Sequence, residues 1–206
     1  MMYTKSAVSA CVFDLGGVVR TEWEDYIREQ FVPRFQVNEG GCHAAFQGAW
    51  ELIETRSGDP RALEMEWAEF ILARLPVALA PQELLKGFLG SIRFHDAAQS
   101  ERTLTWLRDE GVILAIASND THPFFEAAWE QLTLGRYFER TRACVSCFLG
   151  CTKNDSRFFE EVASRLSVAP ECTVFIDDRA GNVQRAEESV GFVPLLVPTG
   201  GCVPAS

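Results

Sequence analysis

Side chains that could carry chemistry follow four short apolar segments of the chain. They are Asp14 after the first segment, Ser118 and Asn119 after the second, Lys153 after the third, and Asp177 and Asp178 after the fourth. Ligands of an open parallel sheet bind beyond the carboxyl ends of its strands, so we expect these side chains to meet at one edge. A carboxylate there can attack an electrophile, a hydroxyl and an ammonium can hold phosphate oxygens, and two more carboxylates can help to bind Mg²⁺. The set predicts magnesium-assisted phosphoryl transfer to an aspartate.

The loop that follows Asp14 contains Leu15, Gly16 and Gly17. Glycine carries no side chain, so the backbone N–H groups of such a loop can approach an anion closely. We therefore expect the backbone of residues 15–17 to contact the phosphate group.

Five apolar runs predict the strands that position these residues. They are residues 7–13, 112–117, 143–148, 173–176 and 193–197, and each is short enough for a strand buried on both faces. Helical patterns at residues 101–110, 156–166 and 182–190 separate the later runs. Alternation of strand and helix predicts an α/β fold, with a parallel sheet covered by helices on both sides.

The stretch between the first two strands has a different pattern, with about 80 residues and no strand signal. Apolar side chains at helical spacing predict four amphipathic helices, within residues 23–31, 46–53, 63–71 and 84–92. Glycine and proline clusters, such as Asn38-Glu39-Gly40-Gly41, are expected to separate them. The sequence therefore predicts a catalytic core of residues 1–18 and 96–206, and an all-helical cap subdomain of residues 19–95. The Gly/Pro-rich tail, residues 198–206, is expected to be mobile.

Composition limits the partners of this chain. It has 206 residues, 47% of them hydrophobic, and a formal charge of −10. Such a charge argues against nonspecific binding to nucleic acid or to an anionic membrane, while a small anionic substrate needs only local cations. There is no run of about 18 apolar residues that could span a membrane, and the first residues do not resemble a secretion signal. Seven scattered cysteines are then expected to be reduced thiols, and we expect a cytoplasmic protein.

Four segments, taken in order, resemble the four motifs of the haloacid dehalogenase-like hydrolase superfamily. Residues 12–19, Val-Phe-Asp-Leu-Gly-Gly-Val-Val, are similar to its first motif, and residues 116–119, Ile-Ala-Ser-Asn, to its second. Lys153 stands where the third motif has its lysine, and residues 174–183 resemble the fourth motif closely. The resemblance implies a three-layer Rossmann-like core with a small helical cap. It also implies a Mg²⁺-dependent phosphatase that acts on small phosphorylated metabolites, sugar phosphates among them.

Roles for individual residues follow from the same resemblance. Asp14 would be the nucleophile. The Asp14 carboxylate, the Gly16 carbonyl and the Asp178 carboxylate would bind Mg²⁺, with Asp177 beside them as a further ligand or as a support.

The resemblance assigns the remaining motif residues to phosphate binding and support. Ser118, Asn119 and Lys153 would bind the phosphate group, and Lys153 would also take part in catalysis. Asn182 would brace the loop of the fourth motif.

One departure from the motifs concerns the residue two positions after the nucleophile. Most phosphatases of the family have an aspartate there as general acid and base, and this chain has Gly16. General acid catalysis contributes roughly 10²–10⁴-fold, so another group or water would have to protonate the leaving group. Two alternatives stay open: a metal-independent 2-haloacid dehalogenase, which has no need of the second aspartate, and a phosphate-binding protein that has lost catalysis. The sequence is also compatible with a homodimer.

Overall fold

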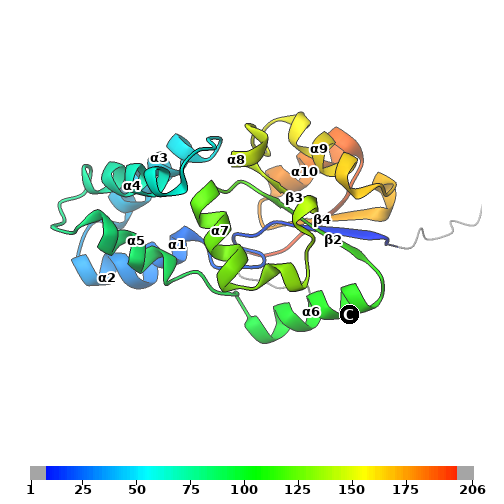
Figure 1. The fold of residues 1–206 in the computed structure, drawn as a ribbon, viewed down its shortest axis with the longest axis horizontal. Helices are drawn as coiled ribbons and strands as arrows, with labels where there is room; N and C mark the ends of the chain where they lie inside the picture. The colour runs from blue at the N-terminus through cyan, green and yellow to red at the C-terminus, as the bar shows by residue number, and fades with distance from the viewer. Residues whose placement is uncertain (1–7, 199–206) are drawn as a thin grey trace, which may run out of the picture.

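A parallel sheet forms the centre of the computed structural model, which describes residues 8–198. Its strands are β1 (Ala10–Phe13), β2 (Ile113–Ser118), β3 (Ala143–Val145), β4 (Thr173–Asp177) and β5 (Val193–Leu196). They lie in the order β3-β2-β1-β4-β5, and all neighbouring pairs are parallel (Figure 1). β1 is therefore the central strand, with the second and fourth sequence motifs on either side of it.

The register of the sheet brings the ends of these strands together. Phe13 at the end of β1 pairs with Ile116 of β2 and with Ile176 of β4. Asp14 therefore leaves the sheet beside Asp177, although 162 positions separate the two in the sequence.

Helices cover both faces of the sheet, as the alternation of strands and helices predicts. Helices α6 (Ala97–Asp109) and α7 (His122–Gln131) pack on one face, and α9 (Ser156–Leu166) and α10 (Ala180–Val190) pack on the other (Figure 1). Each face has its own buried apolar cluster, because the side chains of the buried strands alternate between the two. The predicted α/β class with a three-layer core is confirmed.

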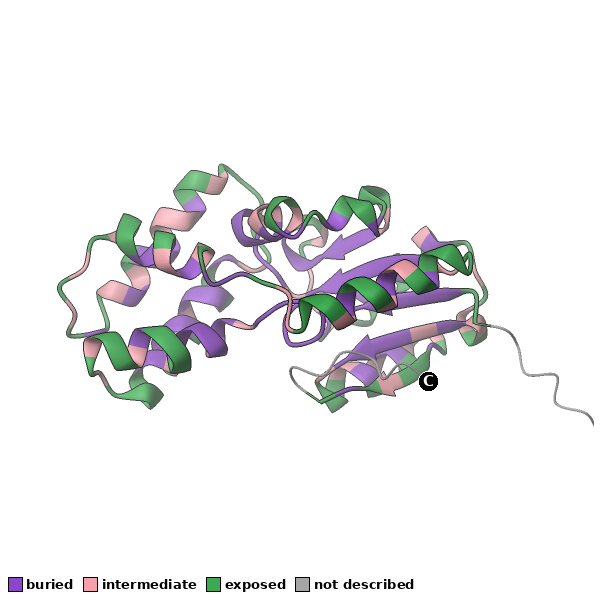
Figure 2. Ribbon diagram, turned by 90° about the horizontal axis from the view of Figure 1, so that it is seen from below, coloured by how far each residue is buried: buried purple, intermediate pink, exposed green. Residues whose placement is uncertain are grey.

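The helical insertion, residues 19–95, has the four helical segments that its apolar spacing predicts. The first segment consists of three elements that follow one another without a break: α1 (Trp23–Tyr26), a π-helical turn η1 (Ile27–Phe31) and α2 (Val32–Phe35). The others are α3 (Glu39–Ile53), α4 (Pro60–Leu72) and α5 (Pro81–Leu89). Figure 2 shows the buried sides of these helices turned toward one another. Aromatic rings fill this third cluster, with Trp67 at its centre.

Two chain segments that lie side by side connect the insertion to the sheet. The Thr21 N–H donates to the Arg93 carbonyl at 2.9 Å, and the Thr21 hydroxyl donates to the Ser91 carbonyl at 3.0 Å. The boundaries expected from the sequence, between residues 18 and 19 and between 95 and 96, fall close to these connections. The division into a core and a cap stays a prediction.

Several elements differ from the sequence-based expectation. The run 143–148 does not form one strand, because β3 ends at Val145 and a short helix α8 (Ser146–Leu149) begins at once. The last strand, β5, is an edge strand rather than a buried one, and its Leu196 is 54% exposed. The expected break at residues 38–41 is wrong in part, because Asn38 caps α3 and the two glycines lie inside that helix.

The remaining short helices are η2 (Leu134–Arg136), η3 (Arg140–Arg142) and η4 (Pro170–Cys172). Within residues 8–198, no helix is both long enough and apolar enough to cross a bilayer. The expectation of a mobile tail concerns residues that, from 199 onward, lie outside the described part of the chain.

Candidate active site

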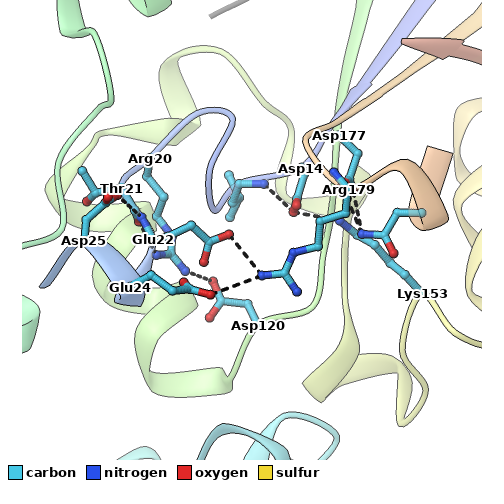
Figure 3. A network of polar contacts seen from close by, with 12 residues as sticks. Asp14, Arg20, Thr21, Glu22, Glu24, Asp25, Asp120, Lys153, Asp177 and Arg179 are labelled. Carbon is cyan, nitrogen blue, oxygen red and sulfur yellow. Dashed lines mark hydrogen bonds and ion pairs between the residues drawn. The ribbon is translucent and has the colours of Figure 1, made fainter. Parts of the chain in front are cut away.

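A buried ammonium group links the first and fourth sequence motifs. The Lys153 Nζ lies 2.8 Å from Asp14 Oδ1 and donates to Asp177 Oδ2 at 2.7 Å (Figure 3). All three residues are buried, with exposed fractions of 6% or less. The expected meeting of these side chains at one edge of the sheet is therefore present.

Neighbouring side chains hold Lys153 and Asp177 in place. The Asn119 Oδ1 accepts a hydrogen bond from the Lys153 N–H at 2.9 Å, which fixes the backbone of the third motif to the second. The Asp177 carboxylate accepts hydrogen bonds from the Asn182 side chain, at 3.0 and 3.1 Å, and from the Arg179 N–H at 2.8 Å. Asp177 is thus occupied by protein donors, the Asn182 side chain among them, and the role of Asn182 as a brace of its loop stays a prediction.

The charges around Asp14 determine its acidity. The pKa of Asp14 is raised to about 6, because burial and, to a smaller extent, the neighbouring Asp177 carboxylate outweigh the lowering effect of Lys153. Burial favours the neutral form of Lys153, but the two carboxylates outweigh it and raise the pKa of Lys153 above its ordinary value. Lys153 is therefore an ammonium, and Asp14 becomes a carboxylate as the pH approaches neutrality.

The carboxylates of Asp14, Asp177 and Asp178 form a group that could bind a metal ion, since one oxygen from each lies within 4.8 Å of the others. Among the described residues, Lys153 is the only ammonium in contact with the first two, so the carboxylates outnumber it. The Asp178 carboxylate packs against the backbone of Gly17, where an added Cβ would lie 2.4 Å from Asp178 Oδ2. Oxygen donors and an excess of negative charge fit a hard divalent cation such as Mg²⁺.

A cavity of about 170 Å³ opens above this group, between the sheet and the helical insertion. On the side of the sheet it is lined by Asp14, Gly16, Arg20, Ser118, Asn119, Lys153, Asn154, Arg179 and Asn182. On the side of the insertion it is lined by Glu22, Trp23, Gln47, Trp50, Glu51 and Glu54. A ligand in this cavity would contact the second and third motifs at its floor and the insertion at its roof.

The space beside Gly16 is filled by another acid. A Cβ added to Gly16 would lie 2.7 Å from Glu22 Oε1, so the Glu22 carboxyl stands where a side chain at position 16 would begin. Burial, then the Glu24 carboxylate, raise the pKa of Glu22 well above its ordinary value, while Arg179 lowers it. Figure 3 shows Glu22 and Glu24 converging on the Arg179 guanidinium, at 3.8 and 3.7 Å.

A second buried ion pair supports the floor of the cavity. Arg20 donates to Asp120 Oδ2 at 2.8 Å, and both side chains are almost fully buried (Figure 3). The Asp120 N–H donates to the Ser146 hydroxyl at 3.0 Å, and that hydroxyl also lies 2.7 Å from the Glu54 carbonyl at the end of α3. Asp120 thus connects the second motif to the insertion.

The structure brings most of the predicted site residues to the cavity. Ser118, Asn119 and Asn182 line it together with Asp14 and Lys153. Their binding and catalytic roles stay predictions.

Leu15 and Gly17 do not line the cavity. The Leu15 N–H donates to Asp14 Oδ1 at 2.7 Å, and the Gly17 N–H donates to the Arg20 carbonyl at 2.9 Å. Both amides are engaged within the protein, so phosphate contact by these two residues stays a prediction without support from the geometry.

Sequence reasoning did not identify the residues that helix α3 contributes to the side of the insertion. Trp50, Glu51 and Glu54 lie on an amphipathic helix where no motif marks a functional position. Arg179 stands inside the fourth motif, but its contacts with Glu22 and Glu24 depend on how the insertion sits on the sheet.

Comparison with known proteins gives a family match over most of the chain. A family model described as a haloacid dehalogenase-like hydrolase matches residues 8–189. Among curated proteins, none matches the sequence.

Solved structures share the fold. An HAD family enzyme, BT-2542 from Bacteroides thetaiotaomicron, in complex with magnesium and inorganic phosphate, has a TM-score of 0.71 at 20% identity, covering 95% of this chain and 96% of that one. An HAD phosphatase from Thermococcus onnurineus has a TM-score of 0.63 at 20% identity, covering 96% and 89%. A dehalogenase has a TM-score of 0.64 at 19% identity, covering 93% and 84%. The four motifs in order and the family match over residues 8–189 lead to one conclusion: this protein belongs to the haloacid dehalogenase-like hydrolases.

Proposed function

We propose that this hydrolase is a Mg²⁺-dependent phosphatase of small phosphorylated metabolites, with sugar phosphates as one candidate class, and that it forms an aspartyl-phosphate on Asp14. The observation that carries the proposal is the acidic group of Asp14, Asp177 and Asp178 around Lys153, of which Asp14 and Lys153 line the cavity. A halide leaving group needs no divalent cation, whereas a cluster of carboxylates beside a nucleophile favours one. The complex of BT-2542 with magnesium and phosphate supports the same choice.

The first step is the attack of Asp14 on phosphorus. A carboxylate oxygen of Asp14 forms a bond to phosphorus while the bond from phosphorus to the ester oxygen breaks, and the alcohol leaves after taking up a proton. Lys153 holds Asp14 in position and offers positive charge to the phosphate oxygens, as Ser118 and Asn119 offer hydrogen bonds. In the second step, water attacks phosphorus and restores the Asp14 carboxylate with release of phosphate.

The cation would be bound by the Asp14 and Asp178 carboxylates and the Gly16 carbonyl, and when bound it supplies positive charge that neutralises the phosphate oxygens. The proton for the leaving alcohol would come from Glu22. Its carboxyl lies over Gly16 and borders the cavity, and burial raises its pKa well above the ordinary value, which favours the protonated form that a general acid needs. This assignment gives the site the acid that position 16 lacks.

The proposal is tested with p-nitrophenyl phosphate. We expect release of p-nitrophenol in Mg²⁺ that stops in EDTA and is abolished in Asp14→Asn, while the surface variant Asp109→Asn retains it. Release of chloride from chloroacetate in EDTA would instead identify a dehalogenase. Binding of phosphate with neither reaction would identify a protein that has lost catalysis.

A further inference from the structure

The roof of the cavity differs in charge from its floor. The five residues Trp23, Gln47, Trp50, Glu51 and Glu54, here called the insertion wall, face the position that the leaving alcohol would occupy. The insertion wall contains two carboxylates and no cation. A substrate with its phosphate group on the floor would therefore present its other end to aromatic rings and negative charge.

Neither carboxylate of the insertion wall has an ion-pair partner among the described residues. The Glu51 carboxylate accepts a hydrogen bond from Gln47 Nε2 at 2.7 Å, and Glu54 has no cation within 4 Å. The cations that line the cavity are engaged elsewhere: Arg20 with Asp120, Lys153 with Asp14 and Asp177, and Arg179 with Glu22 and Glu24. The two carboxylates of the wall thus form no direct ion pair among the described residues, and only the more distant Arg179 guanidinium offsets part of the charge of Glu54.

The backbone holds Glu54 in this position. It is the C-cap residue of α3, and its carbonyl accepts a hydrogen bond from the buried Ser146 hydroxyl at 2.7 Å. Burial, then the nearby Glu51 carboxylate, raise the pKa of Glu54, while Arg179 acts to lower it, so the ionised form of Glu54 carries a cost from desolvation and from its neighbour. A cation placed between them would remove that cost.

The tryptophans of the wall are also fixed. The Trp23 ring stacks on Phe46 with centroids 6.3 Å apart, and the Trp50 ring stacks on Phe124 at 5.6 Å. Both rings are buried and border the cavity. Rigid aromatic surface beside carboxylates is the environment that binds ammonium groups, through cation–π attraction and charge.

We propose, on the basis of the phosphatase function above, that the substrate is a phosphate monoester of a small alcohol that carries an ammonium group. Desolvation of Glu51 and Glu54 by a neutral alcohol would leave their charges unpaired, whereas an ammonium group neutralises them. The cavity of about 170 Å³ is smaller than the roughly 300–1,000 Å³ typical of sites for drug-sized ligands, so the alcohol is short.

The test compares two esters of the same shape. Phosphocholine and 3,3-dimethylbutyl phosphate differ in that a quaternary nitrogen replaces a quaternary carbon. We expect the kcat/KM of phosphocholine, or of phosphoethanolamine against propyl phosphate, to be higher by about tenfold or more. The double variant Glu51→Gln, Glu54→Gln should lose this preference, measured as the ratio of the two kcat/KM values, and Glu69→Gln, on the exposed side of α4, should keep it.

Two results overturn the inference, and they are distinguishable. If the charged and neutral esters are hydrolysed equally, or a sugar phosphate is preferred, the ammonium class is wrong while the phosphatase function stands. If none of these esters nor p-nitrophenyl phosphate is hydrolysed in Mg²⁺, the proposed function fails and the inference fails with it.

Discussion

Gly17 shows how one residue without a side chain can shape a metal site. Its φ of +72° is in the left-handed region, and an added Cβ would lie 2.4 Å from Asp178 Oδ2. Gly111 has a similar φ of +79°, but no atom lies within 4 Å of its added Cβ. Both glycines therefore have a left-handed backbone conformation, but only Gly17 lies against the candidate metal site.

We predict that Gly17→Ala and Gly111→Ala each lower the free energy of unfolding by about 1–2 kcal/mol, the cost of a side chain in the left-handed region. Only Gly17→Ala should also raise the Mg²⁺ concentration needed for half-maximal activity, because it displaces Asp178. Urea denaturation and Mg²⁺ titration of phosphatase activity measure the two effects. Equal Mg²⁺ requirements in both variants would show that Asp178 is not a ligand.

Glu22 provides the second prediction at this scale. Glu22→Gln should lower turnover of an alkyl phosphate by roughly 10²–10⁴-fold, because an alkoxide needs a proton to leave. It should affect p-nitrophenyl phosphate much less, because p-nitrophenolate leaves without one. Glu24→Gln is the matched control, since Glu24 also contacts Arg179 and does not line the cavity. A uniform loss with both esters would assign Glu22 to positioning instead of proton transfer.

The sequence could predict the floor of this site but not its roof. Asp14, Lys153 and Asp177 follow strands, and parallel strands bring their carboxyl ends to one edge whatever lies between them. Glu22 fills the space beside Gly16 because the chain turns there, and the spacing of residues in the sequence does not predict such a contact.

At the scale of elements, one hydroxyl group forms a hydrogen bond that links the end of α3 to the sheet. Ser146 is fully buried, bonds to the Glu54 carbonyl of α3, and accepts a hydrogen bond from the Asp120 N–H. Removing this hydroxyl leaves buried polar groups without a partner, which costs about 1–3 kcal/mol. It also releases the part of α3 that carries the insertion wall.

We therefore predict that Ser146→Ala lowers the free energy of unfolding by about that amount and raises KM more than it lowers kcat. Ser164→Ala, which removes an exposed hydroxyl bonded to a helix carbonyl, should change neither by a measurable amount. Thermal denaturation and steady-state kinetics give the two readouts. A loss of stability with unchanged KM would show that other contacts hold α3.

The boundaries of a helix could be predicted where a capping residue marks its start and the end of its apolar pattern marks its finish. Helix α9 begins and ends as its pattern predicts, because Asp155 caps its N-terminus and the apolar positions stop at Leu166. The strand β3 is shorter than its apolar run, because the backbone turns into α8 while the side chains of Ser146 and Cys147 stay buried. Burial and strand conformation give the same apolar signal, so the sequence could not separate them.

In the whole molecule, the insertion and the sheet share an aromatic contact. Phe124 belongs to α7, which covers the sheet, yet its ring packs against Trp50, Trp67 and Phe88 of the insertion. Four buried rings in contact contribute several kcal/mol through burial and ring geometry together. This packed interface holds the insertion over the cavity, whose floor residues Asp14 and Lys153 are almost fully buried.

This burial predicts that the metal ion contributes to the stability of the folded protein. Three carboxylates around one ammonium leave an excess of negative charge, whose repulsion opposes folding until a cation binds. A cation at 100 times its Kd should stabilise the protein by about 2.7 kcal/mol, which for a chain of this size raises Tm by about 5–10 °C. Differential scanning fluorimetry in Mg²⁺ and in EDTA measures the shift. Asp178→Asn should abolish it, and Asp109→Asn, at the exposed end of α6, should leave it intact. If Asp178→Asn kept the full shift, Asp178 would not be a ligand of the stabilising ion, and the fourth motif would contribute to the site through Asp177 alone.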